Sequence, residues 1–277
     1  MAIAFVGYAV DTSPDGASRY LVYPYSLTGG IDTAARAGDL LVICFAAGGS
    51  SAPAYGFNNT GGLTWTSAGT AYGNDTADAL LDVRYALAAT DPASSIQSSA
   101  VTFQDFAFIL TVWRGVDPAS PLDSLTQFAS GIDSSAPNPP ASLSVTRSGC
   151  TALAFGVGAM PSSEAPAITA PPSGFTSILA ISRSNNTAPD GAISLAYRNN
   201  VASGAALNPG SFTVSKTSTS SAWAAATMIL RPKPGGNARV WNGSAWGTKP
   251  VKVWNGSSWV TKPLKYWNGS AWVTTDY

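Results

Sequence analysis

The chain has 277 residues, of which 45% are hydrophobic and only 11% are charged, with 15 basic and 15 acidic side chains and no histidine. This length allows one large β domain or two ordinary domains. The missing histidine excludes Ser-His-Asp and Cys-His catalysis, and no apolar run approaches the roughly 18–20 residues of a membrane-spanning helix. Residues 1–8 lack a basic segment, so we expect neither a signal peptide nor membrane insertion.

The charges are divided unevenly along the chain. From Arg231 onward there are seven basic residues and one acidic residue, whereas the preceding 230 residues hold eight basic and fourteen acidic ones. Residues 232–237 are rich in Pro and Gly, as linkers between domains often are. We therefore predict a domain over residues 1–231, a linker over 232–237 and a repeat module over 238–277. Nothing in the basic part resembles a nucleic-acid reader, so nucleic acid is not an expected partner.

The first 231 residues are predicted to form strands. Segments 40–47, 106–116 and 150–158 are apolar on both faces and are predicted as core strands. Residues 78–89 also allow a helix by propensity, but the surrounding strands favour another strand. The Ser-, Pro- and Asp-rich residues 117–140 are predicted as a loop. In chain order, the predicted strands cover residues 3–10, 20–23, 40–47, 63–66, 78–89, 101–116, 143–145, 150–158, 175–182, 192–198, 212–214 and 222–230.

No amphipathic helix is evident, and long loops rich in Gly, Ser and Pro separate the strands. This spacing is typical of sandwiches built from two packed sheets. The predicted fold class is all-β, a two-sheet sandwich of the jelly-roll or concanavalin-like type, followed by a small C-terminal module of β-hairpin repeats.

The C-terminal module repeats one phrase, Trp-Asn-Gly-Ser-x-Trp, three times with a period of 13 residues. Asn-Gly between β-forming residues is a strong hairpin signal, because both residues tolerate the positive φ of tight turns. A Lys-Pro step in the spacer ends a hairpin, since Pro cannot donate to a ladder. The predicted turn residues are Asn242, Gly243, Asn255, Gly256, Asn268 and Gly269.

The sequence allows two hairpin registers. A type I′ turn at Asn255-Gly256 would place Trp254 and Trp259 diagonally on one face, and a four-residue loop would place them directly opposite. In both registers two roles are possible for the indoles. They can pack on each other, as part of a folding or oligomerisation element, or they can present rings that stack on sugars. The candidate ligand or partner contacts are Trp241, Trp246, Trp254, Trp259, Trp267 and Trp272 in the repeats, and the loop or strand-end residues Tyr55 and Tyr72.

The remaining reactive side chains do not form a recognisable catalytic pattern. Asp75, Asp78 and Asp82 are close in sequence, as in a Ca²⁺ loop or a carboxylate pair, but we expect them on a solvated surface. Cys44 and Cys150 are too few for a disulfide framework and are predicted to be buried free thiols, with a single bridge as the alternative. We predict no catalytic residue, no metal site and no cofactor, and thus a protein that is not an enzyme.

Two features resemble the minor tail proteins of tailed bacteriophages, especially phages of actinobacteria. One is the sandwich sequence with Gly38-Asp39-Leu40-Leu41-Val42, Gly62-Leu63-Thr64-Trp65 and Val112-Trp113-Arg114-Gly115-Val116-Asp117, and the other is the C-terminal repeat. The resemblance implies a virion component near the tail tip, assembled in the bacterial cytoplasm and exposed to the host envelope. It also implies a homotrimer or other homo-oligomer, contacts with other tail proteins and with host envelope glycan, and no catalytic residues.

Two other functions fit the same residues. A lectin-like surface protein would use the aromatic side chains as sugar platforms. A capsid decoration protein would clamp neighbouring subunits and bind no receptor.

Overall fold

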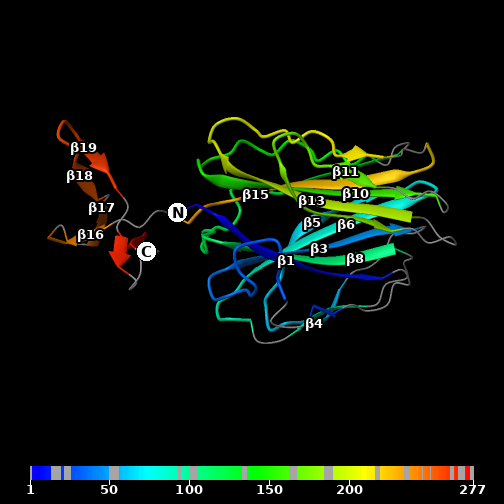
Figure 1. Ribbon diagram of the computed structural model, residues 1–277, viewed down its shortest axis with the longest axis horizontal. Helices are drawn as coiled ribbons and strands as arrows, with labels where there is room; N and C mark the ends of the chain where they lie inside the picture. The colour runs from blue at the N-terminus through cyan, green and yellow to red at the C-terminus, as the bar shows by residue number, and fades with distance from the viewer. Residues whose placement is uncertain are drawn as a thin grey trace. The chain divides into compact units, whose positions relative to one another are not determined.

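The computed structural model describes most of the chain and divides it into two compact units, which we call the body (Ala2–Pro232) and the hairpin module (Lys233–Tyr277) (Figure 1). In the described part, no helix is long and apolar enough to span a membrane. The described residues are 2–13, 20–21, 26–49, 56–92, 95–99, 105–132, 136–161, 167–183, 190–215, 219–233, 238–241, 243–244, 246–249, 251–262, 265–267 and 272–274.

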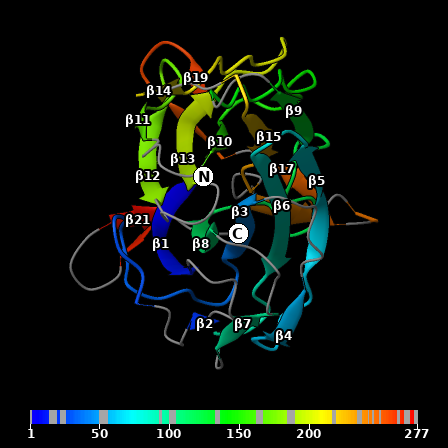
Figure 2. The ribbon, with the colours of Figure 1, turned by 90° about the vertical axis from the view of Figure 1, so that its right-hand side faces the viewer.

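The body contains two five-stranded antiparallel sheets that pack face to face (Figures 1 and 2). The predicted all-β sandwich is therefore confirmed. The chain completes one sheet before it begins the other. The first sheet has the order β1 (Ala4–Ser13), β8 (Asp105–Arg114), β3 (Leu40–Gly49), β6 (Asp78–Leu87), β5 (Thr66–Gly73). The second has the order β12 (Thr176–Arg183), β13 (Asp190–Val201), β10 (Cys150–Met160), β15 (Ala222–Leu230), β9 (Gln127–Ile132).

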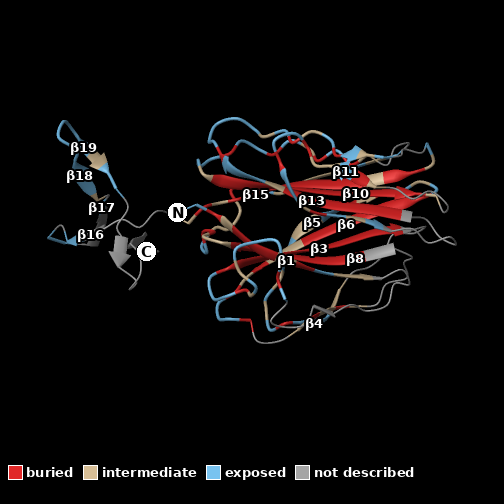
Figure 3. Cartoon of the chain, in the orientation of Figure 1, coloured by how far each residue is buried: buried red, intermediate tan, exposed pale blue. Residues whose placement is uncertain are grey.

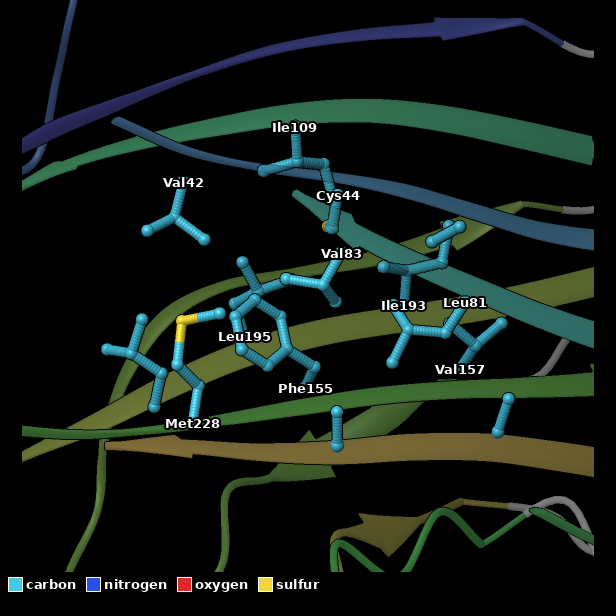
Figure 4. Close-up of a cluster of buried hydrophobic side chains, with 14 of the residues drawn as sticks. Val42, Cys44, Leu81, Val83, Ile109, Phe155, Val157, Ile193, Leu195 and Met228 are labelled. Carbon is cyan, nitrogen blue, oxygen red and sulfur yellow. The ribbon is translucent and has the colours of Figure 1, made fainter. Parts of the chain in front are cut away.

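Burial is concentrated in the central strands of the two sheets (Figure 3). Alternate residues of a strand point to opposite faces. In β3, Val42 and Cys44 face the second sheet, where they join Phe155 and Leu195 in one core (Figure 4). Between them along the strand, Ile43 belongs to a separate cluster on the outer face of the first sheet. This burial on both faces explains why the predicted core strands lack the polar alternation of a half-exposed strand.

Short strands cover the outer faces of the two sheets. Leu27, Phe57 and Ile96 pack over the first sheet, and Ile168 and Phe212 pack over the second. The outer strands form a small sheet of β2 (Tyr20–Leu21), β7 (Ile96–Ser98) and β4 (Phe57–Thr60) in the first half, and a pair of β11 (Ile168–Ala170) and β14 (Thr213–Val214) in the second.

Several segments differ from the sequence prediction. The strand expected at residues 63–66 lies at Thr66–Gly73, and the short strands β4, β7 and β11 were not predicted. Residues 22–23 and 101–104 of two predicted strands lie outside the described residues.

Two further differences concern residues 127–132 and 143–145. Residues 127–132 were expected in a loop, but they form the edge strand β9 and pair with β15. An edge strand needs only one neighbour and a partly buried face, so the mixed sequence Gln-Phe-Ala-Ser-Gly-Ile is sufficient. Residues 143–145 were expected to form a strand, but they contribute one isolated bridge, between Ser144 and Ala206.

Candidate binding surface on the tryptophan hairpins

The three repeats form three separate two-stranded hairpins, and in each the first tryptophan pairs directly with the second. This is the register of a four-residue loop, so the structure selects it over the type I′ alternative. The hairpins consist of β16 (Ala238–Trp241) with β17 (Trp246–Lys249), β18 (Lys252–Trp254) with β19 (Trp259–Thr261), and β20 (Lys265–Trp267) with β21 (Trp272–Thr274).

The loop of the middle hairpin is held by the side chain of Asn255. Its Oδ1 accepts hydrogen bonds from the backbone N–H groups of Ser257 and Ser258, at 2.9 and 2.8 Å, and from the Ser257 hydroxyl at 3.0 Å. The Asn255 N–H donates to the Ser258 carbonyl oxygen at 3.0 Å. Gly256 has a φ of 100°, which an L side chain rarely adopts. These contacts explain why the repeat needs Asn and Gly at these positions.

The other predicted turn residues are described in part. Gly243 of the first hairpin has the same φ of 100° as Gly256. Asn242, Asn268 and Gly269 lie outside the described residues.

Trp254 and Trp259 contact each other but keep much of their surface in solvent. Backbone hydrogen bonds join Val251 to Lys262 and Asn255 to Ser258, and bonded and non-bonded pairs alternate along an antiparallel ladder. The two tryptophans are therefore a non-bonded pair, the kind in which opposed side chains approach closest. The ring centroids are 5.8 Å apart and the planes are tilted by 60°. The exposed fractions are 51% for Trp254 and 64% for Trp259. The indoles are therefore paired and also available to a ligand.

Lys252 and Thr261 lie on the same face as the indoles. They are paired across the hairpin and are two residues from Trp254 and Trp259, and both side chains are exposed. We call these four residues the tryptophan face. It combines apolar rings, a cation and a hydroxyl, a combination suited to stacking on a ring while contacting a polar or anionic substituent.

The same register recurs in the outer hairpins. Arg239 pairs with Thr248 in the first hairpin, and Lys265 pairs with Thr274 in the third. Trp241 is 51% exposed, while the side chains of Trp246, Trp267 and Trp272 lie outside the described residues. The basic residue two positions before each first tryptophan was not identified as a site residue from the sequence, although the 13-residue period contains that signal.

The two tyrosines proposed as contacts belong to the body. Tyr55 lies outside the described residues. Tyr72, on β5, donates its hydroxyl to Asp78 Oδ2 at 2.5 Å. Burial and this carboxylate raise the pKa of Tyr72 to about 12. The Tyr72 hydroxyl thus has a structural partner within the body.

The prediction of a solvated acidic cluster is wrong for Asp78 and Asp82, which are buried. Asp78 also accepts the N–H of Asp75 at 2.8 Å. Asp82 forms a bidentate pair with Arg84, with both N–O distances at 3.0 Å. These partners replace the water that a buried carboxylate would lose. Among the described residues, no group of three or more potential ligands could hold a metal ion.

The other side chains singled out from the sequence belong to the core of the body. Cys44 and Cys150 are buried and free, as predicted. Trp113 is fully buried, and its indole N–H donates to Thr111 Oγ1 at 3.0 Å. The largest exposed aromatic side chains of the described residues are therefore in the hairpin module. In comparisons with known proteins, no family model, no curated protein and no solved structure matches this chain.

Proposed function

We propose that this chain is a non-enzymatic structural protein of a tailed-phage virion. It is a minor tail or tail-tip component whose hairpin module contributes to host-surface attachment. The observation that carries the proposal is the tandem repetition of opposed tryptophan pairs, with half-exposed indoles in the middle hairpin. Exposed tryptophans are costly in solvent and are enriched where proteins bind partners.

Repetition suits attachment to a surface that displays many copies of one ligand. A single pair of half-exposed indoles offers little contact area, and its affinity alone is weak. Three linked hairpins raise the effective concentration for the second and third contacts, so the total affinity exceeds that of one site without new chemistry. Polymeric glycans of a cell envelope present such repeated rings.

The acidic residues of the body support a structural role for it. Buried Asp39, Asp82 and Asp123 each pair with an arginine, at distances of 2.9 to 3.3 Å. Charge-assisted hydrogen bonds of this kind hold the buried carboxylates to neighbouring parts of the fold. The proposal therefore assigns the body to assembly and the hairpins to contact.

The position of the protein on the particle tests this proposal. Gold-labelled antibodies against the body are bound to purified particles of the phage that encodes the chain, and the particles are imaged by electron microscopy. Label at the tail tip is the expected result. Label on the capsid would instead favour a decoration protein, and particles without label would contradict a virion role.

The exposed indoles also favour a second candidate function, a carbohydrate-binding surface module without a virion. Binding of the purified chain to a glycan array, lost in Trp259→Ala with folding retained, supports this function if the particles carry no label. With label at the tail tip, the same array result identifies the host ligand.

A further inference from the structure

The two sheets of the body have the same strand order. Numbered one to five in chain order within each sheet, the strands run first, fifth, second, fourth, third in both. In the first sheet these strands are β1, β3, β5, β6 and β8, and in the second they are β9, β10, β12, β13 and β15. We infer that the body consists of two tandem copies of one five-stranded unit, and that the inner face of each unit is a docking surface for a second copy of the same unit.

The pairing registers of the two copies agree over most of their length, although the β10–β13 ladder has a shift between Cys150 and Ala152 that the equivalent β3–β6 ladder lacks. Each third strand contains a register shift after a Thr-Ser pair, between Ser67 and Gly69 in the first copy and between Ser177 and Leu179 in the second. Bulges are local features that do not follow from strand order. The row that fixes the equivalence joins Thr66, Tyr85, Val42 and Thr111 in the first copy, and Thr176, Tyr197, Leu153 and Met228 in the second.

The outer strands repeat as well. In the first copy β4, which precedes the third main strand, pairs with β7, which precedes the fifth. In the second copy β11 and β14 occupy the same places and also pair, and both pairs contain a register shift. Ser99 donates its N–H to the Gly56 carbonyl at 2.9 Å and accepts the Gly56 N–H on Oγ at 3.0 Å. Ser215 makes the same two bonds to Ala167, at 2.8 and 3.2 Å. In both copies, therefore, a serine at the equivalent position bonds the N–H and the carbonyl oxygen of the same residue. This shared detail supports the duplication.

Glycines mark the same turns in both copies. Gly38 and Gly149 precede the second strands with φ values of 86° and 82°. Gly62 and Gly174 lie four and two residues before the third strands, with φ values of 74° and 77°. Only glycine adopts such values at low cost, so these turns constrain both sequence and backbone.

The copies are related by an approximate two-fold axis parallel to the strands. The order of one sheet runs opposite to that of the other, so β5 lies beside β9 on one side while β1 and β12 lie on the other (Figure 2). The segments after the two fifth strands meet, with a bridge between Val116 and Pro232. The main core is built from equivalent positions, as the pairs Val42 and Leu153, Cys44 and Phe155, Leu81 and Ile193, and Val83 and Leu195 show. A surface that packs on its own copy about a two-fold axis is self-complementary.

The interface has diverged on its two sides. Where β5 lies beside β9, glycines allow close approach, and a Cβ at Gly69 would lie 2.7 Å from the Phe128 ring. The position equivalent to Gly69 is Leu179. On the other side, Phe5, Trp113 and Tyr197 fill the space with ring centroids 5.0 to 5.6 Å apart. Each copy has therefore become fitted to the other, which explains why few identical residues remain.

A circular permutant of the full chain tests the inference. Its first segment is residues 120–231, the second copy. A duplicate of residues 115–120 then connects Arg231 to Ala4, and residues 4–119, the first copy, follow. Residues 233–277, the hairpin module, come last. If the copies are equivalent, the connection that joins the first to the second also joins the second to the first. We expect a folded monomeric body with a main calorimetric transition close to that of the natural chain.

The matched control is a permutant with the same copied connection but opened at Gly61–Gly62, inside the first copy. It is expected to be clearly less stable because its break separates strands of one unit. Equal stability of the two permutants, or an unfolded boundary permutant, would overturn the inference. An experimental structure of the natural chain provides a second measurement. One rotation of about 180° must superpose all five strands of one copy on the other, and superposition of only some strands would refute the duplication.

Discussion

Replacing Arg114 by methionine is expected to destabilise the body, because it leaves a buried carboxylate without its cation. Asp39 is 1% exposed and accepts hydrogen bonds from Nε and Nη2 of Arg114, both at 2.9 Å. A third hydrogen bond to Asp39, from the backbone N–H of Arg36 at 2.9 Å, remains after the substitution. Breaking a fully buried ion pair typically costs about 3–5 kcal/mol.

The Arg114 side chain is 32% exposed, so solvent screens part of this interaction and a loss of about 2–3 kcal/mol is expected. For a domain of this size that loss lowers the midpoint of thermal unfolding by about 4–12 °C. Arg36→Met is the matched control, because it removes a 63% exposed cation that contacts Asp32 at 2.8 Å. Its expected effect is much smaller, because solvent screens an exposed ion pair.

Differential scanning calorimetry of the natural chain and of the variants measures these effects. Adding Asp39→Asn to Arg114→Met removes the orphaned charge and is expected to recover a substantial part of the lost stability. If Arg114→Met and Arg36→Met shift the main transition equally, the buried pair does not contribute more to stability than an exposed one.

Three further predictions follow from burial in the body. Burial raises the pKa of both cysteine thiols, that of Cys150 to about 12. A thiol reagent at about pH 8 should therefore label Cys44 and Cys150 only after denaturation, and rapid labelling of the native chain would contradict this. The pKa of Tyr72 is raised to about 12, whereas an unfolded tyrosine has a pKa of about 10. The contribution of Tyr72 to stability is therefore complete below about pH 10 and is lost as the pH rises toward about 12. Urea unfolding at a series of pH values should show a smaller loss of stability over this range in Tyr72→Phe. Gly73→Ala places a Cβ 2.8 Å from the Trp223 carbonyl oxygen and should lower the free energy of unfolding by about 1–3 kcal/mol, whereas an unchanged urea midpoint would show that the two sheets adjust without cost.

The sequence was sufficient to predict the strands with the strongest patterns. β3, β8 and β10 were predicted because continuous apolar runs are required where both faces of a strand are covered. The hairpins were predicted from a 13-residue repeat with Asn-Gly turns. Strand β9 was missed because an edge strand needs no such run. The burial of Asp82 was missed because its partner Arg84 is two residues away on the same face of the strand, a spacing without a specific sequence signature.

The finer organisation depends on contacts that a single sequence does not display. The opposed tryptophan register depends on how Asn255 bonds to its own loop. The duplication is visible only after alignment by strand register, because identical residues such as Tyr85 and Tyr197 are scattered among replaced core residues. Equivalent apolar side chains such as Val42 and Leu153 preserve packing without preserving identity.

The central claim, that the hairpin tryptophans form the contact surface, is tested most directly by competition for phage adsorption. Host cells are incubated with the purified full chain, with its Trp254→Ala/Trp259→Ala variant or with a chain that ends at Pro232, and the adsorption of particles is then measured. Val253→Ala, on the opposite face of the same hairpin, is the matched control. We expect the full chain and the control to block adsorption. The double variant should be at least about tenfold weaker, as expected for loss of a binding hot spot, and the shortened chain should be inactive. Equal blocking by the chain that ends at Pro232 would contradict it.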